Sequence, residues 1–169
     1  MNPHGRVPVI ADGDAVVWES HAIVRYLAAR DGAGRFWSDD PAARARVEGW
    51  MDWSQTSLQP DFLTGVFWGF YRTPEAKRNY PAIKSALARC ASDFEKLDRL
   101  LEGRSFLLGE NLSLADITAG TSLYRYFELE IERPKLPQVE RWYAMLQHRE
   151  AYRTHIMIPF GELFGRLDY

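Results

Sequence analysis

Cysteine is nearly absent from this chain, since Cys90 is the only one among 169 residues. A lone cysteine excludes an internal disulfide and fits a reducing compartment. A strong charge of one sign is also missing, because 21 basic and 23 acidic residues leave a net charge of −2. This balance gives no electrostatic basis for binding nucleic acid or an anionic membrane, so neither partner is predicted.

Long apolar runs are missing as well. The longest mostly apolar stretch, residues 62–71, is too short to span a bilayer, and the N-terminus has no basic segment followed by an apolar one. The sequence therefore predicts neither a transmembrane helix nor a signal peptide. The histidines, at positions 4, 21, 148 and 155, lack the spacing of zinc ligands, so no metal site is predicted.

The first eighteen residues contain the pattern of a β-hairpin. Residues 7–10 and 15–18 are short β-prone runs, and Asp12-Gly13-Asp14 between them is a turn signal. Pro8 lies inside the first run, where it cannot donate a hydrogen bond to a neighbouring strand. A proline there is consistent with a strand that offers Val7 to a ligand.

Glu19 and Ser20 open an apolar-periodic helix over residues 21–29. Ser20 stands where an N-cap belongs, and Glu19 lies beside the positive end of the helix dipole. Helix-start N–H groups bind anions, and a strand edge can pair with an extended peptide. Together the two halves predict a site for an extended peptide that pairs with Val7 and seats a free carboxylate at the helix start.

Helical periodicity dominates from residue 36 onward, and no strand is predicted there. Asp40 and Pro41 mark a helix start, Pro60 is expected to bend or break that helix, and Gly103 is a natural C-cap. The predicted helices cover residues 41–58, 61–71, 83–101, 113–127, 138–147 and 150–156, followed by a tail over 159–169. The predicted fold class is therefore mostly α, with a hairpin-plus-helix unit ahead of a helical bundle.

Ser113 and Asp116 have the spacing of a capping box. In that motif the serine bonds the third helical N–H, and the acid reaches back to the serine N–H. A catalytic Ser/Asp pair would need a base, and no histidine lies nearby in the sequence. The pair is therefore interpreted as structural, and Cys90, beside the apolar face of its helix, as an inert buried thiol.

Three segments carry a resemblance to a known family. They are Asn2-Pro3-His4-Gly5-Arg6-Val7-Pro8-Val9-Ile10, then Glu19-Ser20 followed by Ala22-Ile23 and Tyr26-Leu27, and Leu112-Ser113-Leu114-Ala115-Asp116-Ile117. At this spacing they resemble the cytosolic glutathione transferases, of a bacterial, theta- or beta-like kind. The resemblance implies a partial thioredoxin-like, glutathione-binding domain over residues 1–32 and an all-α domain over 40–169. It also implies a cytoplasmic homodimer that acts in detoxification.

The resemblance implies roles for five residues. Val7 and a cis Pro8 would pair with the cysteinyl part of glutathione, Ser20 would bind the γ-glutamyl carboxylate, and Glu19 its ammonium. Arg6 would lie near the glycyl carboxylate. The alternatives are an ordinary edge strand with a trans proline at 7–8, a simple helix cap at 19–20, and a solvated loop charge at Arg6. Glutathione would be a substrate, and no metal would be needed.

The second substrate implied by the resemblance is a small hydrophobic electrophile. Trp50, Trp53 and Phe67 are candidate walls of its pocket, although a helical core explains most aromatic residues in this segment. The homodimer would form through the helices over 20–30 and 41–58.

The family's domain begins with a strand, a helix and a second strand that have no counterpart here. Its catalytic Ser, Cys or Tyr lies near the end of that first strand, so no catalytic residue is predicted in this chain. A truncated form that binds glutathione weakly, if at all, and has negligible transferase activity is expected. Two alternatives remain open. One is a non-catalytic binding or protein-interaction module of the same fold, and the other is that Met1 is an internal methionine of a longer reading frame.

Overall fold

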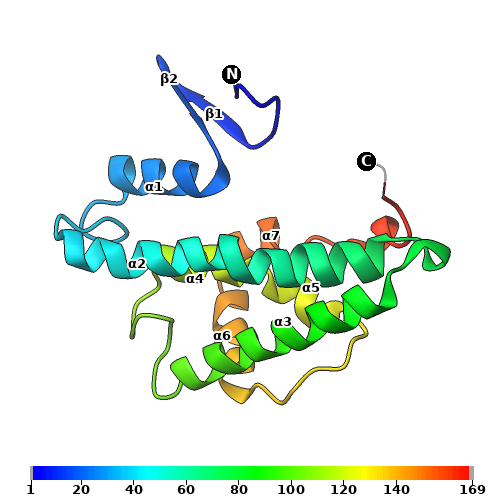
Figure 1. Ribbon diagram of the computed structural model, residues 1–169. Coiled ribbons are helices and arrows are strands. Elements are labelled where there is room, and N and C mark those ends of the chain that lie inside the picture. Colours follow the sequence, from blue (N-terminus) through cyan, green and yellow to red (C-terminus); the bar gives the residue numbers. More distant parts are fainter. Residues whose placement is uncertain (1, 168–169) are drawn as a thin grey trace.

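The computed structural model describes residues 2–167 and has a hairpin and a helix ahead of a helical remainder (Figure 1). β1 (Val9–Asp12) and β2 (Ala15–Trp18) are antiparallel, with Val9 opposite Trp18 and Asp12 opposite Ala15. Gly13 has a φ of 57° in the two-residue turn, a conformation that glycine adopts without strain. The hairpin predicted from the sequence is confirmed.

α1 (Ser20–Asp31) follows the hairpin and is tied to its turn. The Tyr26 hydroxyl donates to the Asp12 carboxylate at 2.6 Å, and Arg30 forms an ion pair with the same carboxylate. Asp12 is the last residue of β1, so these bonds hold the later turns of α1 at the turn end of the hairpin. The first turn of α1 therefore lies at the open end, where the chain leaves β2.

α2 (Pro41–Trp53) runs below α1 in Figure 1 and begins as the sequence predicts. The Asp40 carboxylate caps it by accepting the Ala42 N–H at 3.0 Å, and Pro41 takes the first helical position. Arg25 of α1 pairs with Asp52 of α2, which joins the N-terminal part to the helical part.

The helix that begins as α2 does not end within residues 53–60. It continues from α2 into η1 (Ser54–Arg72), whose turns are wider than those of an α-helix, and the two form one rod in Figure 1. Pro60 lies inside η1, so of the two outcomes expected there, a bend or a break, the break is wrong. The winding changes earlier, at Ser54, and the wider turns of η1 continue past Pro60, although the proline has no N–H to donate and its ring crowds the preceding turn.

The remaining helices surround one face of this rod (Figure 1). The segment predicted as one helix over 113–127 is divided at residues 121–122. The Tyr152 hydroxyl donates to the Gly120 carbonyl at 2.7 Å, and this long-range bond occupies the acceptor where the first part ends. The elements are η2 (Glu75–Lys77), α3 (Tyr80–Leu100), α4 (Leu114–Gly120), α5 (Leu123–Glu128), α6 (Pro137–Gln147), α7 (Glu150–His155) and η3 (Gly161–Leu163).

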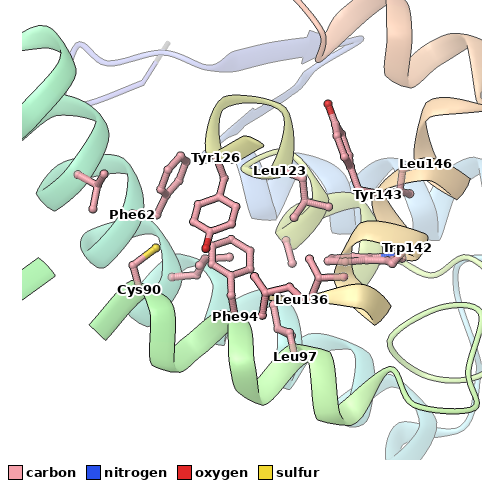
Figure 2. Packing of buried hydrophobic residues seen from close by; sticks show 14 of the residues in the cluster. Phe62, Cys90, Phe94, Leu97, Leu123, Tyr126, Leu136, Trp142, Tyr143 and Leu146 are labelled. Atoms are coloured by element: carbon pink, nitrogen blue, oxygen red, sulfur yellow. The ribbon is translucent and has the colours of Figure 1, made fainter. Parts of the chain in front are cut away.

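The main core lies between η1, α3, α5 and α6 (Figure 2). Tyr126 stacks on Phe94 with ring centroids 3.9 Å apart and meets Phe62 edge-on at 5.6 Å. Cys90 lies beside these rings and is buried, as the sequence predicts. The architecture confirms the predicted class, a mostly helical fold with a small two-stranded sheet at its N-terminus.

Candidate functional site

The register of the hairpin brings the predicted glutathione-binding residues together. Because Val9 is paired with Trp18, the residues just before β1 and just after β2 lie at the same open end of the hairpin. Val7 is 89% exposed there. The five predicted residues, Arg6, Val7, Pro8, Glu19 and Ser20, are all exposed.

The loop before β1 is ordered by its own hydrogen bonds. The Asn2 side-chain amide donates to the Arg6 carbonyl at 2.7 Å, and the His4 N–H donates to the Asn2 side-chain oxygen at 2.8 Å. The His4 ring meets Trp18 edge-on at 5.4 Å, which holds the loop against β2. The bond between Val7 and Pro8 is cis. Both residues precede β1, so the prediction that Pro8 lies inside the strand is wrong.

Glu19 has an unusual backbone conformation. Its φ is 69° and its ψ 125°, and among residues 2–167 no other non-glycine residue has a positive φ. Such a conformation costs about 1–3 kcal/mol and is found most often at functional sites. Glu19 is the N-cap and Ser20 the first helical residue, so the assignment of Ser20 as N-cap is wrong by one position. Because Ser20 is the first helical residue, its N–H is one of the first-turn donors that have no partner within the helix.

A pocket of about 260 Å³ lies directly beneath this first turn of α1. Ser20, His21 and Val24 form its roof, and the walls come from η1 and from the α4–α5 region. Burial lowers the pKa of His21, and the positive charge of Arg25 acts in the same direction. His21 is therefore neutral at physiological pH and adds no charge to the pocket.

The walls of the pocket are partly polar. Several hydroxyls already donate to their own helix: Ser54 to the Met51 carbonyl at 2.7 Å, and Thr121 to the Thr118 carbonyl at 2.8 Å. Gln59, Thr118, Ser122 and Arg125 supply the other polar side chains of the walls, and Phe62, Leu63 and Ile117 supply the apolar ones. The lining of the pocket thus combines apolar and hydrogen-bonding side chains.

The three aromatic residues predicted to form the electrophile pocket lie elsewhere. Trp50 and Trp53 meet edge-on at 5.2 Å and border a different surface pocket, together with Leu108. Phe67 is 2% exposed and packs in the core against Phe160. None of the three lines the pocket beneath Ser20.

Other chemistry has little support in the described residues. Burial raises the pKa of the Cys90 thiol to about 12, so this cysteine is not a thiolate at physiological pH. Between residues 2 and 167, no three His, Cys, Asp or Glu side chains are grouped as metal ligands. No helix in this part of the chain is long and apolar enough to cross a membrane.

The fold and the site define a class of two-part proteins, in which a thioredoxin-like unit with a cis-proline loop precedes an all-helical unit. The family model described as "Glutathione S-transferase, N-terminal domain" matches residues 1–29. The model described as "Glutathione S-transferase, C-terminal domain" matches residues 60–150.

Individual relatives agree with these matches. The glutathione S-transferase GstB of Escherichia coli strain K12 is 38% identical over 161 residues, which are 94% of this chain and 77% of that protein. A theta-class glutathione S-transferase from Xanthomonas axonopodis pv. citri, solved with glutathione bound, is 40% identical. Its TM-score is 0.86, and the match covers 94% of this chain and 75% of that one. The chain therefore belongs to the glutathione S-transferase family.

A more distant relative has a different kind of name. A probable elongation factor 1-gamma of Arabidopsis thaliana is 27% identical over 156 residues, which are 90% of this chain and 37% of that protein. Proteins that resemble this chain thus include some that are not named as transferases.

Sequence reasoning missed the pocket residues. Gln59, Ile117 and Arg125 come from separate elements and follow no motif. The one sequence signal is weak: Arg125 is a charged residue among the apolar and aromatic residues 123–127. Only the packing of α1 over η1 and α4 brings them together.

Proposed function

We propose that this protein uses glutathione as a substrate and either conjugates it through its sulfur to a small hydrophobic electrophile or uses it to reduce one. The observation that carries the proposal is the exposed cluster at the open end of the hairpin, which lies beside a pocket of about 260 Å³. Membership of the glutathione S-transferase family supplies the ligand that this cluster fits.

The proposed roles follow from the groups that each residue exposes. The Val7 backbone pairs with the cysteinyl part of glutathione, and Arg6 lies near the glycyl carboxylate. The γ-glutamyl carboxylate sits on the Ser20 N–H and hydroxyl, where helix-start donors and the dipole favour an anion. Glu19 accepts a hydrogen bond from the γ-glutamyl ammonium. The strained φ of Glu19 supports this role, because such conformations gather at ligand sites.

The electrophile occupies the pocket beneath α1 in this proposal. Its apolar part contacts Leu63 and Ile117, in place of the tryptophans suggested by the sequence. In conjugation, the glutathione thiol gives its proton to solvent, its sulfur forms a bond to the electrophilic carbon, and the leaving group departs with its bonding electrons. The residues described above bind and orient glutathione, and we assign no role in thiol activation to Cys90.

Two variants of Ser20 separate its hydroxyl from its N–H. Ser20→Ala removes only the hydroxyl and is expected to weaken glutathione binding about fivefold, as for one lost hydrogen bond. Ser20→Pro also removes the N–H, and proline is well tolerated at the first helical position, so about tenfold weakening is expected. Isothermal titration calorimetry with glutathione measures both.

Ser92→Ala is the matched control, because Ser92 is exposed on α3 and lies outside the pocket. It should bind glutathione as the unaltered chain does. Unchanged affinity in both Ser20 variants, or no glutathione binding by the unaltered chain, would contradict the proposed site.

We also propose a homodimer formed through α1 and α2. Leu27 of α1 is 37% exposed, so α1 has apolar surface to cover. Light scattering at micromolar concentration should give about twice the 19.5 kDa chain mass. Leu27→Glu should shift the mass toward the monomer, whereas Ile158→Glu, at a 58% exposed position in the C-terminal segment, should not. A monomer mass for the unaltered chain would refute the dimer.

The alternative function is a non-catalytic interaction module of the same fold. The match to an elongation factor 1-gamma over 90% of this chain favours it. The calorimetric experiment discriminates the two functions, because a module would not need to bind glutathione.

A further inference from the structure

Three residues that line the pocket beneath α1 carry hydroxyls whose protons are already used. The Ser54 hydroxyl donates to a backbone carbonyl of the preceding turn at 2.7 Å, and the Thr121 hydroxyl donates to the Thr118 carbonyl at 2.8 Å. The Thr118 hydroxyl shares its proton between the Leu114 and Ala115 carbonyls, at 3.1 and 3.2 Å. A hydroxyl has one proton and two lone pairs, so each of these oxygens keeps the capacity to accept a hydrogen bond.

Two of these acceptors, Thr118 and Thr121, are neighbours on one face of a helix. Thr118 belongs to α4 and Thr121 is its C-cap, and residues three positions apart lie on the same side of a helix. Thr118 is 9% exposed, whereas Thr121 is exposed. A pair of acceptor oxygens at this spacing matches a ligand group with two N–H donors, such as the NH₂ of a primary amide.

The lining favours a neutral donor over a cationic one. Among the described residues that line the pocket, none is an aspartate or glutamate, and His21 is kept neutral as described above. An ammonium group would lose its hydration there without gaining a carboxylate. Gln59 and Ser122 also line the pocket, and their side-chain donors suit the carbonyl oxygen of an amide.

We infer that the electrophile carries a neutral N–H donor group of the primary-amide kind, and that Thr118 and Thr121 select it. This inference rests on the proposed function. The carbon chain contacts Leu63 and Ile117, and the N–H groups donate to the two threonine oxygens. A ligand without donors would displace water from these oxygens and replace none of its hydrogen bonds. The donor group takes no part in bond making or breaking. At about 260 Å³ the pocket is smaller than most ligand sites, which favours a short chain.

Two product analogues that differ in a single group test this inference without requiring turnover. S-(3-amino-3-oxopropyl)glutathione ends in an amide NH₂, and S-(3-oxobutyl)glutathione carries a methyl group in its place on the same chain and carbonyl. Isothermal titration calorimetry should show that the unaltered chain binds the amide about fivefold more tightly, as for one net hydrogen bond.

Thr118→Val and Thr121→Val each replace one hydroxyl by a methyl group of similar size. Each should lower the preference for the amide to about twofold, and the double variant should abolish it, while the affinity for glutathione stays unchanged. Because Thr121 is exposed, its variant is available even if valine at the buried Thr118 prevents folding. Thr56→Val is the matched control and should retain the full preference. The Thr56 hydroxyl also donates to a carbonyl of its own helix, at 2.9 Å, but Thr56 does not line the pocket.

The outcomes separate this inference from the proposed function. Equal binding of the two analogues by the unaltered chain, or tighter binding of the ketone, overturns the inference and leaves the proposed function standing. A full preference for the amide in Thr121→Val also overturns it, because the N–H groups would then bind elsewhere. Weakening of glutathione and both analogues by the same factor in the threonine variants overturns it as well. Failure of all three ligands to bind the unaltered chain overturns both proposals.

Discussion

Asp116→Ala is expected to lower the free energy of unfolding by about 4 kcal/mol, because the carboxylate satisfies several buried donors at once. Asp116 has no exposed surface. One of its oxygens accepts the Leu107 N–H at 2.8 Å and the Trp142 indole N–H at 3.1 Å. The other accepts the Ser113 N–H at 2.9 Å and the Ser113 hydroxyl at 2.7 Å. Alanine would leave the Leu107 and Trp142 donors buried without an acceptor.

Thermal denaturation followed by circular dichroism measures this effect, and a fall in melting temperature of about 10 °C is expected. Ser113→Ala is the matched variant and should cost only about 1 kcal/mol, as for loss of a helix cap. The double variant should cost less than the sum, since both residues belong to one network. If the melting temperature fell no further for Asp116→Ala than for Ser113→Ala, the Leu107 and Trp142 N–H groups would not depend on the Asp116 carboxylate as their acceptor.

Asp116→Asn probes the charge separately. Burial raises the pKa of Asp116, and the hydrogen bonds from Leu107, Ser113 and Trp142 act against that rise. The asparagine keeps the shape and one acceptor but places an amide N–H₂ opposite donors. It should therefore lie between the unaltered chain and the alanine variant in melting temperature.

The sequence predicts the contact between Ser113 and Asp116, but not the bonds that Asp116 accepts from Leu107 and Trp142. The spacing of Ser113 and Asp116 is enough to identify the capping box, which the structure contains. Leu107 and Trp142 lie outside any short motif, and Trp142 comes from α6. A contact between residues 26 positions apart depends on how α6 packs on α4, which periodicity does not specify.

The same division applies to the candidate site. The hairpin pattern predicts that Val7 and Ser20 lie close, because the antiparallel register follows from the turn. Composition suggested Trp50, Trp53 and Phe67 for the second pocket because they are aromatic and adjacent in sequence. The direction in which these three side chains point depends on how α2 and η1 are rotated about their axes relative to the rest of the bundle. The change of winding at Ser54, inside a continuous rod, alters this rotation, and no sequence pattern marks it.

Gly65→Ala is expected to destabilise the protein by about 2 kcal/mol, although alanine favours helix by about 1 kcal/mol over glycine. A Cβ at Gly65 would lie 2.5 Å from the Cβ of Ala86, closer than two carbons can approach. Ala86 is 1% exposed and its Cβ is fixed to the α3 backbone, so relief requires η1 and α3 to separate. A flexible side chain could move aside, but a Cβ cannot.

Gly69→Ala is the matched control, on the same helix and facing the same partner. Its Cβ would lie 3.5 Å from the Ile83 side chain, an ordinary contact, so a gain of about 0.5–1 kcal/mol from helix propensity is expected. Ala86→Gly combined with Gly65→Ala should recover stability, because the missing methyl makes room for the new one. Chemical denaturation of Gly65→Ala, of Ala86→Gly alone and of the double variant gives the coupling energy. Equal effects of Gly65→Ala and Gly69→Ala would mean that η1 and α3 do not meet closely at Gly65. Because Ala86 is buried, a residue of η1 other than Gly65 would then have to pack against it.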